Sequence, residues 1–256
     1  MAALLCIAAA VVPANAASVD HESLVYSGSF AGVKVLALTA GVDLRGDGYT
    51  LEVDFRTTGA VDFISHSQIR TVAGGRWQSG RAIPSQYHSD GVLRGRTHRV
   101  EILYPDGQPH VSIFDSEPDL EREPVPADMQ RGTVDGLSAM ANLLQNVASL
   151  GVCDGDVRTY DGRFLALMQA TDGGQEMLPA KSDSLYHGPA LRCDITTTPL
   201  AGFPKGSEPS DAQRRPRHSS AWFARVHEGG PLVPVLIEIE LRVVGHMTLK
   251  LVEAPG

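Results

Sequence analysis

"SLVYSGSFAGVKVLALTAGVDLRGDGYTLEVDFRTTG", residues 23–59, places apolar side chains at every second position through three extended segments. In the third segment apolar and charged residues take turns: Leu51, Glu52, Val53, Asp54, Phe55 and Arg56. Because a strand turns successive side chains to opposite faces, each segment has one apolar face and one polar face. The pattern predicts antiparallel strands with one face in a core and the other in water.

The same pattern recurs along the chain. The stretch "PVLIEIELRVV", residues 234–244, sets five apolar residues on one face: Val235, Ile237, Ile239, Leu241 and Val243. Turn sequences such as "RGDGY", "HSDGV", "YPDGQ" and "EGGP" separate such segments at intervals suited to hairpins. The sequence therefore predicts a mainly β protein with a single antiparallel curved sheet of about ten strands.

Residues 133–151, "TVDGLSAMANLLQNVASLG", depart from this period of two. Thr133 or Asp135 can cap the N-terminus of a helix, and Gly151 lies where that helix should end. We expect one substantial helix whose apolar stripe is buried against the dry face of the sheet. The stripe recurs at helical spacing and consists of Leu137, Met140, Ala141, Leu144, Val147 and Ala148.

Two stretches have the composition of loops. Residues 115–132 are acidic and rich in proline, and residues 201–220 are poor in hydrophobic residues and contain three prolines. Strand-like pattern flanks both stretches, so neither marks a domain boundary. We expect residues 17–256 to form a single β domain with a mobile loop at 201–220.

The first residues, "MAALLCIAAAVVPANA" (1–16), have the pattern of a secretory signal peptide. An apolar run is followed by Pro13 and by an A-x-A cleavage site at residues 14–16, although no Lys or Arg precedes the run. The alternative, a buried N-terminal helix, would have to end at this site by coincidence. No other apolar run approaches the ~20 residues of a membrane-spanning helix. We expect an exported protein without a transmembrane segment in its mature chain.

The net charge restricts the class of binding partner, and the cysteine content bears on the cellular compartment. The formal net charge of -8 makes nucleic acid, or an anionic membrane surface, a poor partner for the chain as a whole. Cleavage of the signal peptide would leave two cysteines, Cys153 and Cys193, both in segments that look extended. In an oxidising compartment an even count favours a disulfide, with two separate buried thiols as the alternative.

The chain carries no motif for catalysis, a cofactor or a metal. Residues 136–140, "GLSAM", lack the second glycine of a nucleophile elbow, and no phosphate-binding glycine loop follows a strand. The nine histidines are scattered without a zinc-binding spacing. Asp154, Asp156 and Asp161 do not match the spacing of a calcium loop. We expect a protein that is not an enzyme, with no catalytic residues, no metal site and no cofactor. The alternative is a hydrolase whose catalytic residues form no recognisable motif.

Four features occur in order along the chain: Tyr26-x-Gly28 with "FAGVKV", Asp135-Gly136-Leu137-Ser138 at the start of the helix, "VCDGDVRTYDGR" followed by "RCDITTTPLAGF", and the C-terminal alternating strands. Together they resemble the DUF3108 family, exported bacterial proteins of unknown function. The resemblance implies a periplasmic location. It also implies an open antiparallel half-barrel, similar to the fold of lipoprotein carriers, in which a curved sheet wraps one helix.

A sheet of this size has more apolar face than one four-turn helix can cover. The sheet's own curvature, a lipid or a protein partner would bury the remainder favourably. We expect a binding or carrier module for an apolar ligand such as a lipid or acyl chain, with Met140 and Met168 as adaptable lining residues. The alternative is a structural or assembly factor that contacts another protein of the cell envelope. The candidate lining residues are Leu36, Leu38, Leu51, Val53, Phe55, Met140, Leu144, Ile237, Ile239 and Leu241.

Overall fold

The computed structural model describes residues 23–44, 46–116, 121–206, 208–241 and 245–255. The predicted signal peptide, residues 1–16, lies outside this part of the chain. The strands are β1 (Ser23–Phe30), β2 (Val33–Asp43), β3 (Gly48–Thr57), β4 (Gln68–Gln78), β5 (Arg81–Leu93), β6 (Arg96–Leu103), β7 (His110–Ser116), β8 (Gly155–Tyr160), β9 (Leu165–Leu178), β10 (Gly188–Ala201), β11 (Arg217–Arg225), β12 (Leu232–Glu240) and β13 (His246–Glu253). The helices are α1 (Ala60–Ile64), α2 (Ala127–Gln130), α3 (Gly136–Leu150) and α4 (Asp211–Arg214), with a 3₁₀ turn, η1 (Pro105–Gly107).

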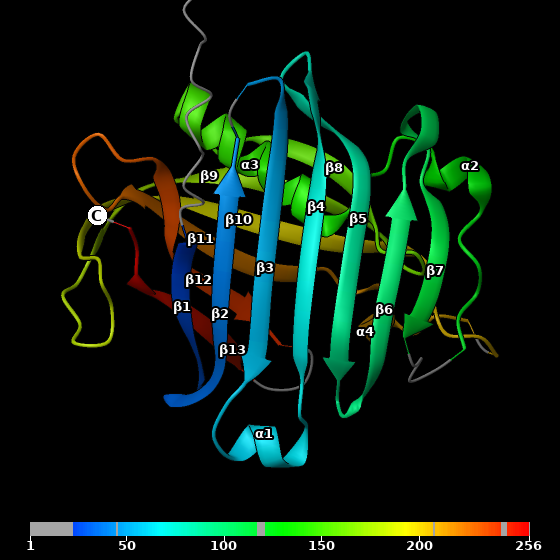
Figure 1. Ribbon diagram of the computed structural model, residues 1–256, viewed down its shortest axis with the longest axis horizontal. Helices are drawn as coiled ribbons and strands as arrows, with labels where there is room; N and C mark the ends of the chain where they lie inside the picture. The colour runs from blue at the N-terminus through cyan, green and yellow to red at the C-terminus, as the bar shows by residue number, and fades with distance from the viewer. Residues whose placement is uncertain (1–22, 45, 117–120, 207, 242–244, 256) are drawn as a thin grey trace, which may run out of the picture.

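The strands form one antiparallel sheet in the order β7-β6-β5-β4-β3-β2-β1-β13-β12-β11-β10-β9-β8. Figure 1 shows the two halves of this sheet as two layers: β2–β6 lie in front, and the strands from β8 to β13 cross behind them. Helix α3 lies between the layers, since it contacts β3, β4 and β5 on one side and β8 and β12 on the other. The predicted mainly β architecture, a curved antiparallel sheet around one long helix, is confirmed.

The predicted count of strands and helices was too low. In the described part of the chain the sheet has 13 strands, and three short helices accompany α3. Half of the residues of β8 are exposed, and residues 171–177 of β9 are exposed on both faces. A strand without a buried face shows no alternation of apolar and polar residues, so such segments are not recognised as strands from the sequence pattern. Helices α1, α2 and α4 have four or five residues, too few to show helical periodicity.

Helix α3 has the ends that its sequence predicts. The Asp135 side chain accepts a hydrogen bond from the backbone N–H of Ser138, and Gly151 adopts the left-handed conformation at the C-cap. The buried face differs slightly from the predicted stripe, because Ala148 is exposed. The residues of α3 that are buried are Ser138, Ala139, Ala141, Leu143, Leu144 and Val147.

The two edges of the sheet approach each other at what we call the seam, which is formed by β7, the β8–β9 turn and the segment at Val134. Strand β8 pairs along its outer side with residue Val134, which forms a parallel bridge to Thr159. Strand β7 meets the β8–β9 turn, where a Cβ on Gly162 would lie 3.0 Å from the Phe114 ring. Gly162 also has a positive φ of 96°, so this turn requires glycine for both its conformation and its packing. The seam is therefore filled by the chain that leads into α3.

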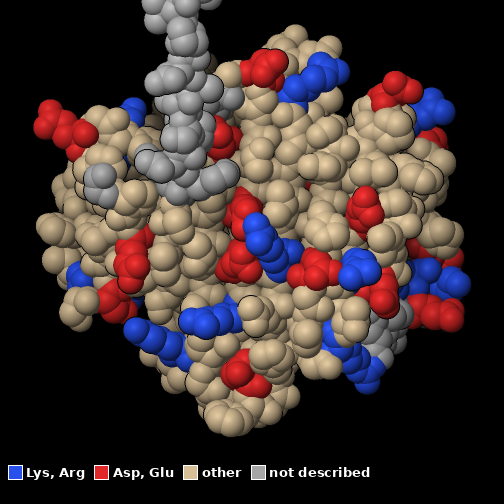
Figure 2. All heavy atoms as spheres, in the orientation of Figure 1, with Lys and Arg blue, Asp and Glu red and all other residues tan. Residues whose placement is uncertain are grey.

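The two faces of the sheet differ as predicted. Facing α3, Leu51 and Phe223 belong to a buried cluster with the helix residues Leu143, Leu144 and Val147. On the outer face, positive and negative side chains are interspersed (Figure 2). One ion pair joins Arg70 to Glu52 at 2.7 Å, and another joins Arg99 to Asp90 at 2.9 Å. On the inner side, α3 and the opposite layer of the same sheet cover much of the apolar face of each layer.

Part of the segment 201–220, which was predicted to be a loop, has regular secondary structure. Strand β10 continues to Ala201, and β11 begins at Arg217. Between them Pro204 forms an isolated bridge with Arg122, and α4 follows a capping box at Ser210. The connection proper is therefore 202–216.

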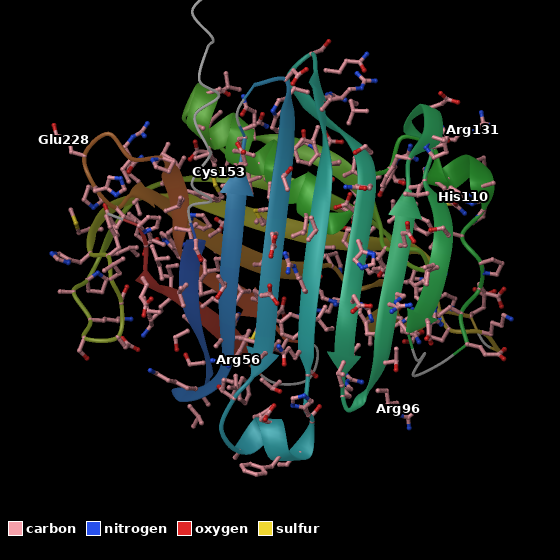
Figure 3. All side chains as sticks on the ribbon, viewed as in Figure 1. Arg56, Arg96, His110, Arg131, Cys153 and Glu228 are labelled. Atoms are coloured by element: carbon pink, nitrogen blue, oxygen red, sulfur yellow. A yellow bond between two sulfur atoms is a disulfide. The ribbon has the colours of Figure 1, made fainter. Side chains whose placement is uncertain are left out.

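Helix α1 lies at one end of the half-barrel, beyond the ends of the strands (Figure 1). It joins β3 to β4, while the β1–β2 turn and the β5–β6 turn flank it at the same end. Arg56 and Arg96 are labelled at this end in Figure 3. We refer to segments 31–34, 56–67 and 93–96 together as the α1 end.

Candidate functional site

A groove of about 560 Å³ runs beside α3, between the start of β5 and the edge strand β8. Ligand pockets for small organic molecules commonly have about 300–1,000 Å³. We call it the α3 groove. It is lined by parts of 79–84, 132–134, 139–150, 153–157 and 168–170, with Gly107.

The α3 groove exists because small residues line it where the helix and the sheet approach each other. Leu143, Met168 and Val157 supply larger apolar surface among these small residues. Of the two predicted adaptable methionines, Met168 lines the groove and Met140 packs against the buried cluster around α3 instead. The small lining residues are Gly80, Ala82, Gly132, Ala139, Gly155 and Ala170.

Polar residues gather at the mouth of the groove. Arg81, Asp154 and Asp156 are exposed there, while Ala82, Ala139 and Leu143 are buried deeper. Leu150 lines the groove with 68% of its surface exposed, so apolar surface reaches the solvent. The lining therefore mixes apolar side chains with polar ones, such as the buried Thr133 and the half-buried Asn142, and has charged side chains at its rim, an arrangement suited to an amphiphilic ligand.

Hydrogen bonds fix the helical wall of the groove. Asn142 Oδ1 accepts a hydrogen bond from the backbone N–H of Ala82 at 2.7 Å, which ties α3 to β5. Asn146 Nδ2 donates to the carbonyl oxygen of Asp154 at 3.1 Å, which ties α3 to the segment before β8. These bonds hold the walls of the groove in one relative position.

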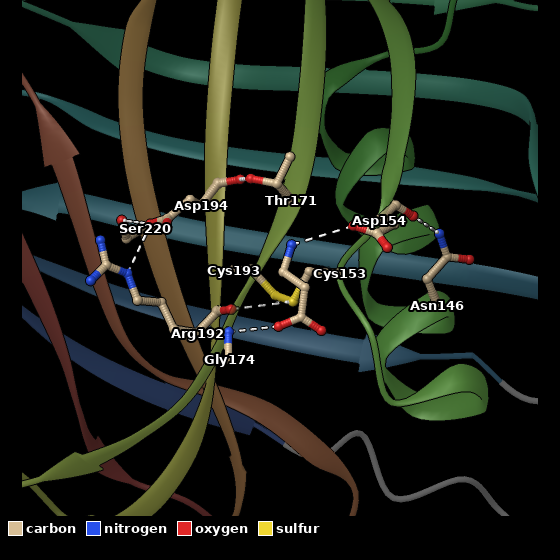
Figure 4. The surroundings of a disulfide bond; sticks show 10 residues. Asn146, Cys153, Asp154, Thr171, Gly174, Arg192, Cys193, Asp194 and Ser220 are labelled. Carbon is tan, nitrogen blue, oxygen red and sulfur yellow. Dashed lines mark hydrogen bonds and ion pairs between the residues drawn. A yellow bond between two sulfur atoms is a disulfide. The ribbon is translucent and has the colours of Figure 1, made fainter.

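The predicted disulfide between Cys153 and Cys193 is present, with a sequence separation of 40 between the two cysteines (Figure 4). It joins the chain just after α3 to β10, and Cys153 lines the groove. Figure 4 also shows Asp154 accepting a hydrogen bond from the backbone N–H of Asp172 on β9. The end of α3 is thus attached covalently to the rear layer.

A buried polar cluster anchors the other end of α3. Tyr49 Oη donates to Ser138 Oγ at 2.7 Å, and Ser138 Oγ donates to Asp135 Oδ2 at 2.6 Å. Asp135 and Ser138 are fully buried. Burial raises the pKa of Asp135 above its usual range, although the two hydrogen bonds from Ser138 act in the opposite direction. Ser138 has no exposed surface through which a substrate could reach it.

This cluster predicts a pH dependence of stability. The pKa of Asp135 is higher in the folded state than in the unfolded state, where it is about 3.9. Asp135 therefore makes its full favourable contribution to the free energy of unfolding at pH values below its unfolded-state pKa. This contribution is lost as the pH rises through the folded-state pKa. Asp135→Asn keeps an amide that can cap α3 and removes the ionisation. We expect its unfolding free energy, relative to the wild type, to increase with pH.

Urea unfolding of both proteins between pH 4 and pH 7 measures this difference. Each unit by which the folded and unfolded pKa values differ is worth about 1.4 kcal/mol. The other carboxylates are common to the two proteins and cancel in the comparison. A difference in stability that stays constant over this range would contradict the prediction.

None of the ten predicted lining residues lines the α3 groove. Nine of them lie in strands or in α3, and Leu241 follows the end of β12. Leu51 and Leu144 are buried around α3, where Met140 and Ile237 also pack. Leu36, Leu38, Ile237 and Ile239 pack in a second cluster around β1, β12 and β13. The remaining three are half-buried: Val53, Phe55 and Leu241.

A second cavity of about 360 Å³ lies at the seam near β7. Its lining combines three arginines, Arg122, Arg163 and Arg217, and the side chains of Asp161 and His98 with apolar and aromatic ones: Tyr87, Val100, Phe114 and Phe164. Among the described residues, no group of three His, Cys, Asp or Glu side chains is placed to hold a metal ion. Within the same ranges, no helix has the length and hydropathy to cross a membrane.

The open antiparallel half-barrel around one helix, with a groove beside that helix, defines a β-barrel-like protein. The chain belongs to the DUF3108 family, described as a protein of unknown function, whose profile matches residues 24–252. Among solved structures, it is similar to a β-barrel-like protein of the domain of unknown function DUF1849 from Brucella abortus. The similarity has a TM-score of 0.55 at 14% identity and covers 91% of this chain and 96% of the other. At this identity the likeness concerns the fold. No curated protein matches the chain.

Proposed function

We propose that this protein is a periplasmic binding module that holds an acyl chain, or an apolar ligand of similar shape, in the α3 groove. The observation that carries the proposal is the groove of about 560 Å³, which has buried apolar side chains among polar ones and charged residues at its mouth. An acyl chain would lie against Leu143, Val157 and Met168, and a polar head group would remain near Arg81.

The expected affinity follows from the apolar area that binding would bury. About 300 Å² of buried chain contributes about 7.5 kcal/mol at 25 cal/mol per Å². Part of this is offset by the cost of association and of ordering the chain. We therefore expect dissociation constants in the micromolar range or weaker.

Two features support the periplasmic location in this proposal. The first sixteen residues have the pattern of a signal peptide, and the disulfide between Cys153 and Cys193 suits an oxidising compartment. Cell fractionation, together with the mass of the purified chain, tests this part of the proposal. Recovery in the cytoplasm with residues 1–16 still attached would contradict it.

Titration with a fluorescent fatty acid tests the binding function. We expect saturable uptake at one site, with displacement by an unlabelled fatty acid. A short-chain acid with the same carboxylate is the control, because it lacks the apolar length that the groove would bury. Equal displacement by the short and long acids, or no uptake at all, would contradict the proposed function.

A further inference from the structure

We propose that the α1 end docks on the surface of an anionic lipid membrane, with Phe63 and Ile64 entering the interfacial region. These two side chains are 94% and 87% exposed, more than the other large hydrophobic residues of the described chain that are exposed. Val33, on the neighbouring β1–β2 turn, is 63% exposed. Three bulky apolar side chains thus face solvent at one end of the molecule.

A hydrogen-bonded turn presents this apolar surface. The backbone N–H of Thr57 donates to the carbonyl oxygen of Ser67 at 2.9 Å, which closes the base of the β3–β4 connection. Thr57 Oγ1 donates to Asp62 Oδ1 at 2.6 Å, and the backbone N–H of Thr58 donates to the carbonyl oxygen of Val35 at 3.0 Å. The connection is held against β2, and Phe63 and Ile64 project from it.

The charges around this surface identify the kind of partner. Within the α1 end, Lys34, Arg56, Arg94 and Arg96 are all exposed, and Asp62 is the one carboxylate of these three segments. Figure 2 shows Lys and Arg side chains on both sides of the lobe at the bottom of the molecule. The whole chain, in contrast, has a formal net charge of -8. The α1 end is therefore locally cationic on an acidic protein.

Asp62 is ionised, so it offsets one of the four positive charges of these segments and leaves three. Its carboxylate accepts hydrogen bonds from Thr57 and His66, and the bond from Thr57 is the main reason that its pKa lies below the usual range. Apolar side chains surrounded by Lys and Arg are the combination that binds interfacially to anionic bilayers. A protein partner would need an acidic surface next to an apolar pocket. A bilayer of anionic phospholipids supplies negative charge in its head groups and apolar surface in its acyl chains.

Vesicle flotation tests the proposal. The protein is purified from cells that express the full chain, and its N-terminus is confirmed by mass so that no unprocessed apolar segment contributes. Phe63→Ser/Ile64→Ser is compared with Met177→Ser/Leu185→Ser, which replaces exposed hydrophobic residues of the β9–β10 hairpin. On vesicles of phosphatidylethanolamine and phosphatidylglycerol we expect the first pair to lower binding at least about tenfold. The second pair should leave binding unchanged.

The charges give a second readout. Lys34→Gln/Arg56→Gln should weaken binding to the anionic vesicles, and added salt should weaken binding of the wild type. Vesicles of phosphatidylcholine alone should bind less protein. No binding of the wild type to anionic vesicles, or equal binding by Phe63→Ser/Ile64→Ser, would overturn the proposal. Capture of one protein by a photocrosslinker at position 63, without vesicle binding, would overturn it in favour of a protein partner.

This proposal is independent of the α3 groove, because the α1 end shares no residue with the groove lining. Phe63→Ser/Ile64→Ser should retain its affinity for a fluorescent fatty acid. Failure of membrane docking and failure of ligand binding would therefore be seen in separate measurements.

Discussion

Val157→Trp lowers the affinity of the protein for a fluorescent fatty acid about tenfold or more. Val157 lies on β8, is half-buried and lines the α3 groove opposite α3. An indole at this position would occupy space that the ligand needs. If it removes about 60 Å² of apolar contact, the loss is about 1.5 kcal/mol, or about tenfold in the dissociation constant. Fluorescence titration of the purified variant measures the change.

Val72→Trp is the matched control for this substitution. Val72 is also half-buried in a strand, but it lies on the outer face of β4, away from the groove. The two variants therefore share the change in side chain and differ in position. We expect Val72→Trp to bind with the wild-type affinity. Equal affinities for the wild type and Val157→Trp would show that ligand does not occupy this part of the groove.

The double variant Cys153→Ala/Cys193→Ala unfolds with a free energy about 4 kcal/mol lower than that of the wild type. The bridge closes a loop with a separation of 40 residues. In the chain-entropy description, opening such a loop restores about this much conformational freedom to the unfolded state. Both cysteines are fully buried, so the variant also loses packing at the end of α3. Denaturant unfolding gives the free energy directly.

Reduced wild-type protein is the control for the disulfide. It retains both side chains, so its loss of stability isolates the covalent bond from the loss of packing. We expect the reduced protein to approach the double variant in stability. Stabilities of the oxidised protein and the double variant within about 1 kcal/mol of each other would contradict the proposed role of the bridge.

Local patterns in the sequence predict local structure well in this protein. Leu51, Val53 and Phe55 share one face of β3, as alternation requires. Asp135 and Gly151 cap α3 because side-chain capping and a left-handed glycine depend on residues close in sequence. The disulfide could also be predicted, since cysteine count and compartment restrict the pairing.

The candidate site could not be predicted in the same way. Alternation identifies the apolar face of a strand, but it does not show which part of that face remains uncovered. Leu36 and Phe55, for example, lie on inward faces and still do not line the groove. The groove forms where Ala82 and Gly155, distant in sequence, approach α3 from opposite sides. Small residues in separate segments carry no joint pattern, and only the order of strands in the sheet brings them together.

The proposed function requires that an apolar ligand occupies the α3 groove in the cell. Native mass spectrometry of the protein, released from cells under mild conditions, tests this most directly. We expect a species that is heavier than the processed chain by the mass of one lipid or fatty acid. The Val157→Trp variant should lack this added mass. A spectrum with only the unliganded mass, together with no fatty-acid uptake by the same sample, would contradict the proposed function.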